Sequence, residues 1–189
     1  MNPIKERKPI KYLAVENISF DRLACTNSRF FHNRHLSIIL NDKPLNTASL
    51  QKEIIYHVAE ARLILILKGY VEVNLNLEDQ YIEQGYVLLL PADSIMELKG
   101  CSDDLEVIAF IIREKFLIDE SLVFPTSPKD FQQLLKMTYL TWDLAQHTPF
   151  RKDVVLPIVQ AIVVNIQCIY KEMNATTVTD AAARQQQLF

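Results

Sequence analysis

The strongest pattern in the chain is a series of short apolar runs between residues 62 and 91, separated by polar or glycine-containing breaks. Arg62–Lys68 is rich in Leu and Ile, and after a break at Gly69 the segment Val71–Leu77 alternates strictly between apolar and polar residues. These two runs predict a β-hairpin. Further strands are expected at Gln80–Ile82 and Tyr86–Leu90, and four short strands in so few residues predict a small antiparallel barrel or sandwich.

More strand-like runs flank this region. They are Leu36–Leu40, Glu53–Val58, Ile95–Leu98 and Leu105–Ile112. The sequence therefore predicts about eight strands before Phe116.

Beyond Arg113 the apolar period changes from two residues to 3.6. A Ser-Pro pair at Ser127 predicts the start of a helix that continues to about Gln146. A second helix is expected from Arg151 to Met173, with a kink at its internal proline. Its central run is uncharged, but it is short for a membrane span and contains several polar residues, so a buried helix is the favoured interpretation.

Composition narrows the classes of function. The chain has 189 residues, of which 49% are hydrophobic, and a formal net charge of −3, so it lacks the overall positive field that favours nucleic-acid binding. Three widely spaced cysteines, Cys25, Cys101 and Cys168, suit buried thiols in a reducing compartment. The first residues do not resemble a secretory leader, and we expect a cytoplasmic protein. No nucleophile or phosphate-loop motif occurs, so no catalytic residue is nominated.

A resemblance rests on four pieces of sequence. They are Leu65–Gly69, Gly85–Pro91, the Ser102-Asp103-Asp104 loop and Thr148–Arg151. The first pieces resemble a cupin barrel. In their order along residues 59–189, all four make the chain similar to the amino-terminal sensor region of AraC-type transcription regulators, especially those of Bacteroidetes. The implied fold is mainly β with α: a cupin-like antiparallel β-barrel (double-stranded β-helix) followed by a carboxy-terminal helix pair.

The resemblance also implies a division of the chain and a set of partners. Residues 1–11 form a flexible basic arm, 12–116 the barrel, 117–175 a helical dimerisation region, and 176–189 the start of a linker. Such regulators are expected to act as homodimers that bind a small polar or anionic effector. They contact DNA through a helix-turn-helix unit, which is absent from this chain, and they do not enter the membrane.

The metal-binding motifs of cupin enzymes can be compared with this chain position by position. With the first motif anchored on Gly69, Arg62 takes the place of its glutamate ligand, and the two histidines fall on Tyr56 and Val58 or on Ile55 and His57. In the second motif Met96 takes the place of the histidine. At most one of four ligands is therefore present, and we expect neither a metal nor another cofactor.

The positions of the lost ligands are expected to point into the barrel. This nominates His57, Arg62 and Met96, together with Ile64 two residues along the same strand face. An inward Arg62 is a buried charge that requires an anionic partner, either a nearby glutamate or a ligand carboxylate or phosphate; the alternative is an Arg62 in water at the rim.

Two alternatives belong to other classes of function. A cupin-fold enzyme would require the missing metal ligands. A cyclic-nucleotide-type binding barrel shares the segment Leu67–Val73, but it requires a Gly-Glu pair and a following Arg, and the residues directly after Pro91, Ala92–Glu97, contain neither.

The uncharged helix is apolar around most of its circumference, more than one barrel can cover. A second subunit is expected to cover the remainder. The predicted dimerisation residues are Val155, Ile158, Val159, Ile162, Val163, Ile166 and Ile169.

Overall fold

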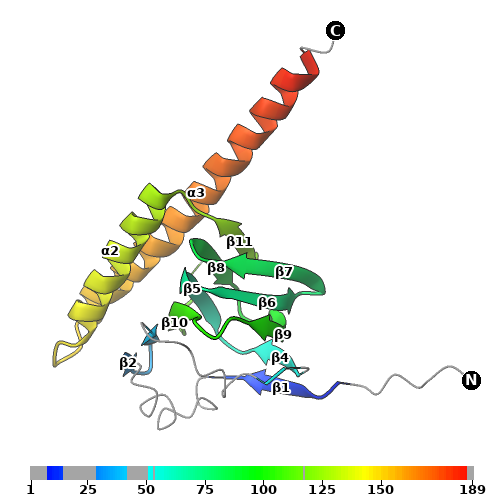
Figure 1. Cartoon of the computed structure of the whole chain (residues 1–189). Helices are drawn as coiled ribbons and strands as arrows, with labels where there is room; N and C mark the ends of the chain where they lie inside the picture. The colour runs from blue at the N-terminus through cyan, green and yellow to red at the C-terminus, as the bar shows by residue number, and fades with distance from the viewer. Residues whose placement is uncertain (1–7, 15–28, 42–50, 53, 117, 187–189) are drawn as a thin grey trace, which may run out of the picture. The chain divides into compact units, whose positions relative to one another are not determined.

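The computed structural model describes residues 8–14, 29–41, 51–52, 54–116 and 118–186. The chain divides into two compact units, Met1–Pro125 and Thr126–Phe189. The first contains the strands and the second contains two helices (Figure 1). Residues 1–7 of the predicted arm lie outside the described residues, as does Cys25, whereas Ile10 and Lys11 of the arm belong to a strand.

The strand unit consists of two sheets. The five-stranded sheet has the order β1 (Ile10–Leu13), β4 (Ile55–Val58), β9 (Ile95–Cys101), β6 (Tyr70–Leu75) and β7 (Glu78–Glu83). The six-stranded sheet has the order β11 (Leu122–Pro125), β8 (Tyr86–Leu90), β5 (Ala61–Lys68), β10 (Glu106–Ile112), β3 (Leu36–Asn41) and β2 (Arg29–His32).

The strand order identifies the fold. Strands β3 to β10 form two four-stranded halves, β3-β10-β5-β8 and β4-β9-β6-β7, and the chain passes from one half to the other at almost every connection. All neighbours within these halves are antiparallel. This is the two-sheet jelly-roll arrangement of cupins, the double-stranded β-helix. The predicted fold, a cupin-like barrel followed by two helices, is therefore confirmed.

Every second side chain along the strands points into the space between the two sheets, and together these side chains form the core. On β5, Ile64 and Ile66 join the apolar cluster of the interior, and Leu88 and Leu90 join it from β8. The five-stranded sheet supplies side chains such as Val73 to the same cluster. The alternate residues of β5, Leu63 and Leu65, are also buried, on the opposite face of the six-stranded sheet. That sheet is therefore apolar on both faces, which explains its nearly continuous hydrophobic sequence.

The predicted hairpin between residues 62–68 and 71–77 is wrong in its pairing. β5 pairs with β8 and β10, whereas β6 pairs with β7 and β9 in the other sheet. One residue, Gly69, connects β5 to β6, which is too short for a hairpin turn. Its φ of +74° favours glycine, and a Cβ there would lie 2.1 Å from Ser102 Oγ. Gly69 therefore carries the chain from one sheet to the other.

The hairpin that does form is β6–β7. Its turn is Asn76-Leu77, with φ values of 49° and 75°, and not residues 78–79 between the two predicted strands. Positive φ at both central residues matches the turn type that suits twisted two-residue hairpins. The side chain of Asn76 secures this turn by accepting a hydrogen bond from Ile95 N at 2.9 Å. A leucine at positive φ gives no recognisable turn signal, so the sequence pattern missed the position.

The helical unit contains α2 (Pro128–Ala145) and α3 (Lys152–Gln186), which pack against each other. Ser127 caps α2 as predicted, because its hydroxyl accepts a hydrogen bond from Asp130 N at 3.1 Å. α3 extends well beyond the predicted end at Met173. Its segment Lys152–Ala175 is long and apolar enough to cross a membrane by length and composition alone, a test that core helices of soluble proteins also pass.

Candidate functional site: a buried arginine in the barrel

Arg62 lies on the inner face of β5, in line with Ile64 and Ile66. In the strand register it is opposite Leu90 on β8, a member of the interior cluster, and opposite Ile111 on β10. Only 8% of the residue is exposed. The expectation of an inward Arg62 is therefore confirmed, and the alternative of a solvated Arg62 at the rim is wrong.

The guanidinium of Arg62 has few partners for a buried charge. Its Nη2 donates to the carbonyl oxygen of Leu13 at 2.7 Å and lies 3.6 Å from Glu60 Oε2. Its Nε has no hydrogen-bond partner among the described residues. Burial lowers the pKa of Arg62 to about 10; Glu60 opposes this shift, and the positive charge of Arg113 adds to it. The electrostatic balance therefore favours a further negative charge near this group.

Arg113 extends the positive region. It follows β10 and donates from Nη1 to Asn33 O at 2.5 Å and from Nη2 to Ser37 Oγ at 2.8 Å. Ser37 is fully buried and lies opposite Ile111, on the same face as Arg62. Two guanidinium groups and a hydroxyl thus lie toward one end of the six-stranded sheet. This set of groups can bind a carboxylate or phosphate.

The other nominated ligand residues divide into two groups. Ile64 and Met96 join the interior apolar cluster, as expected. His57 does not point inward: on β4 the inward residues are Tyr56 and Val58. His57 lies on the outer face, with its ring 5.1 Å from that of Tyr12 and its Nε2 3.5 Å from Asp93 Oδ1. The expectation for His57 is corrected because the register places Tyr56, and not His57, opposite Met96.

The structure shows which side chains point inward at the positions where cupin enzymes carry their metal ligands. The inward side chains at these positions are Tyr56, Val58, Arg62 and Met96, and none is a usual ligand for a transition metal in cupins. Within the described part of the chain, no group of three or more His, Cys, Asp or Glu side chains could hold a metal ion.

The predicted dimerisation residues lie on α3, and most of them are inaccessible in a single chain. Two of them, Ile158 and Ile169, are half-buried. The other five are at most 2% exposed: Val155, Val159, Ile162, Val163 and Ile166. A second face of α3 is exposed and also apolar. It carries Val154, Pro157, Ala161, Val164 and Cys168.

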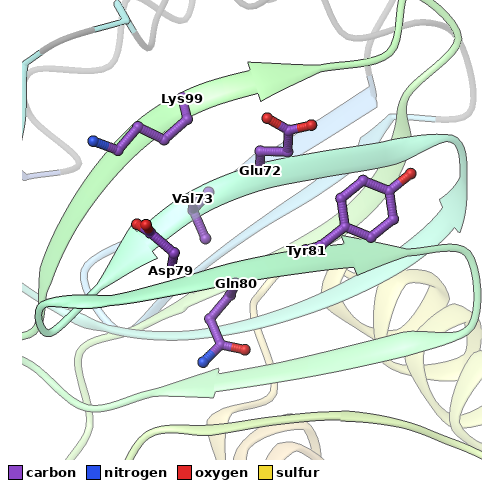
Figure 2. Close-up of a pocket in the computed structure, with 6 residues that line it drawn as sticks. All are labelled: Glu72, Val73, Asp79, Gln80, Tyr81 and Lys99. Atoms are coloured by element: carbon purple, nitrogen blue, oxygen red, sulfur yellow. The ribbon is translucent and has the colours of Figure 1, made fainter.

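A shallow hollow of about 430 Å³ lies on the five-stranded sheet, away from Arg62. Figure 2 shows its lining: Glu72 and Val73 on β6, Asp79, Gln80 and Tyr81 on β7, and Lys99 on β9. No pattern in the sequence singles out these residues, because they belong to ordinary alternating strands.

Comparison with known proteins gives structural likenesses only. No family model and no curated protein matches the sequence. Among solved structures, ToxT from Vibrio cholerae is similar at 13% identity and a TM-score of 0.45, covering 76% of this chain and 58% of that protein. The AraC-like transcriptional activator CuxR is similar at 12% identity and a TM-score of 0.49, covering 75% and 54%. A cupin protein from Bacteroides fragilis is similar at 13% identity and a TM-score of 0.35, covering 50% and 87%.

This chain thus covers little more than half the length of ToxT and of CuxR. At these identities and scores, the likenesses carry no conclusion about what the chain binds or does.

Proposed function

We propose that this chain is the effector-sensing and dimerising module of an AraC-type transcription regulator, and that it acts in the cytoplasm without a metal. The effector is a small molecule with a carboxylate or phosphate group. DNA binding is assigned to a helix-turn-helix unit outside these 189 residues. The observation that supports this proposal most directly is the buried and incompletely paired Arg62 on the inner face of the barrel.

A buried cation with an unpartnered nitrogen is costly, so a fold that needs only stability gains little by keeping it. An apolar side chain at position 62 would suit the surrounding interior, which is lined by leucine and isoleucine. A binding role accounts for the charge, because an anionic group at Nε would complete its hydrogen bonding and offset the repulsion from Arg113.

The contact with Leu13 suggests how binding is communicated. Leu13 is the last residue of β1, and its carbonyl oxygen is held by Arg62 from within the barrel. β1 is also an edge strand, paired only with β4 among the described strands. An effector anion at the guanidinium competes with the Leu13 carbonyl, so binding alters the attachment of β1 and of the basic segment before it.

A thermal-shift screen of monocarboxylates, dicarboxylates and sugar phosphates tests the proposal. A ligand present at about 100 times its Kd stabilises the fold by about 2.7 kcal/mol, which is readily detected. We expect at least one class to raise the Tm of the natural chain and to have no effect on Arg62→Leu. Lys68→Leu is the matched control, since Lys68 is an exposed cation on the same strand. A ligand that stabilises Arg62→Leu equally well would disprove the role of Arg62.

The exposed face of α3 supports the dimerisation part of the proposal. Val154, Ala161 and Cys168 are spaced by seven residues, with Pro157 and Val164 between them, which is the a/d spacing of a two-stranded coiled coil. Val154 and Val164 are 43% and 48% exposed, although both are apolar. We therefore assign the partner subunit to this stripe rather than to the buried residues around Ile162.

Sedimentation velocity on single-residue variants tests this assignment. Ala161→Glu places a charge in the stripe and should dissociate the dimer while the chain stays folded. Gln160→Glu is the control, because residue 160 is exposed and lies about 100° from Ala161 around the helix. Ile162→Glu and Val163→Glu should instead destabilise the fold, since both side chains are buried. A natural chain that is monomeric at tens of micromolar would rule out the dimer.

A further inference from the structure

β7 is the terminal strand of the five-stranded sheet, and no described strand pairs with its outer edge. The alternate N–H and C=O groups along such an edge are free to pair with an added strand. β7 reads EDQYIE, so three of its six residues are acidic. Acidic side chains protect an edge from pairing with a copy of itself, and at the same time they attract a strand of opposite charge.

Two tyrosines lie on the outer face of the same hairpin. Tyr70 on β6 and Tyr81 on β7 stack with their ring centroids 5.2 Å apart and their planes at 24°. Tyr81 remains 55% exposed. Edge protection alone does not require an exposed aromatic stack. Such a stack does offer a π-face to a cation.

Carboxylates surround this stack. In the register, Glu72 is opposite Tyr81 and Glu83 is opposite Tyr70. Within the described part of the chain, the side chains of Glu72 and Glu83 make no hydrogen bond or ion pair. By contrast, Asp79 accepts a hydrogen bond from Asn74 at 2.7 Å. Loss of hydration raises the pKa of Tyr81, and Glu83, Tyr70 and Glu72 raise it further, as expected for a locally negative surface.

The geometry of the hollow fits an incoming side chain. Figure 2 shows Glu72 and Tyr81 on one side of the hairpin, with Gln80 directed to the other side. Beyond Glu72 lies Gly100 on β9, where a Cβ would come within 3.4 Å of Glu72 Oε2. The glycine therefore leaves room beside the carboxylate. Lys99, a cation in the hollow, is paired with Glu97 at 3.1 Å, and among the described residues it forms no ion pair with Glu72.

From these observations we propose that the β7 edge is a docking site for a basic, extended peptide segment of a partner protein. The peptide adds to β7 as a further strand. One of its arginine side chains lies over Tyr81 and pairs with Glu72, and a second basic side chain faces Glu83. Hydrogen bonds between the main chains of the peptide and β7 supply the affinity, and the alternate basic side chains of the peptide supply the selectivity. Peptides that add a strand to an exposed sheet edge are recognised in this way. This inference does not depend on the effector site at Arg62.

Fluorescence polarisation with a labelled peptide of alternating Arg and Thr tests the proposal on the full chain. We expect saturable binding that is weakened at least about tenfold by Glu72→Gln, because a charge-assisted hydrogen bond is lost. Tyr81→Ala should weaken binding about two- to fivefold through loss of the π-face. Glu120→Gln is the matched control: it removes the same charge at an exposed position outside the hairpin and should leave the affinity unchanged.

Three further probes separate edge pairing from other modes of binding. The same peptide with citrulline in place of arginine should lose affinity, since it keeps the shape without the charge. A peptide methylated on alternate backbone nitrogens should also fail to bind, because it cannot pair with β7. Free arginine amide should bind far more weakly than the peptide. If the methylated peptide or arginine amide bound as tightly as the unmodified peptide, strand addition would be disproved. If Glu72→Gln bound the peptide as tightly as the natural chain, the assignment of the site to Glu72 would be disproved.

Discussion

Replacing Arg62 by leucine should leave the fold intact in the absence of any ligand. Burial in the folded chain lowers the pKa of Arg62 from its ordinary value to about 10. At 1.36 kcal/mol per pH unit, keeping this side chain charged in the barrel therefore costs about 3 kcal/mol. Leucine avoids this cost and gains apolar burial next to Ile64 and Leu90.

One favourable contact is lost in the same substitution. The hydrogen bond from Arg62 to the Leu13 carbonyl involves a charged donor and contributes about 1.5–3 kcal/mol. The two effects nearly cancel, so we expect the free energy of unfolding of Arg62→Leu to lie between unchanged and about 2 kcal/mol higher.

Urea denaturation followed by circular dichroism measures this difference. Glu60→Gln provides the opposite perturbation: it keeps the buried cation and removes a carboxylate that lies 3.6 Å away. It should lower the free energy of unfolding. If Arg62→Leu instead loses more than about 2 kcal/mol, Arg62 is a structural tie for β1, and the argument that its charge is retained for binding is refuted.

Three other predictions follow from the structure and composition. Elemental analysis of the purified chain should find no stoichiometric zinc, iron or manganese; one such ion per chain would restore the enzyme alternative. In a mobility-shift assay, the chain alone should bind DNA weakly, without sequence preference and only at low salt, because its net charge is −3; tight selective binding would contradict this. The pKa of Glu97 is lowered, first by the hydrogen bond from Lys8, against the effect of burial, and then by Lys99. The stability that these pairs contribute is present above the ordinary pKa of 4.5 and is lost as the pH falls through the lower folded-state value. Between pH 7 and acid pH, Glu97→Gln should therefore lose less stability than the natural chain. Equal losses would show that Glu97 does not contribute to the acid sensitivity of the fold.

Most of the strands and the class of the fold could be predicted from the amino-acid sequence alone. Runs such as 86–90 and 105–112 became β8 and β10 because their apolar side chains fit a sheet that is buried on both faces. The Ser127 cap was equally readable, since capping depends on residues adjacent in the chain. The inward orientation of Arg62 was one of two alternatives at the level of the sequence, suggested by the comparison with the cupin metal motif, and the burial of the residue in the structure decided between them.

Which strands lie next to each other in the sheets could be learned only from the tertiary structure. Local pattern could not show that β5 and β6 belong to different sheets, because pairing depends on strands far apart in the chain. β1 and β11 were missed for a related reason: each has only four residues and is defined by its neighbour, β4 or β8.

The candidate sites show the same limit. The partner of Arg62 is a backbone carbonyl 49 residues away, which has no side-chain signature in the sequence. His57 and Tyr56 are adjacent in sequence, and only the register with β9 decides that Tyr56 faces the interior. The Tyr70–Tyr81 stack likewise depends on where the β6–β7 turn falls, and a shift of one residue would place Tyr81 on the other face.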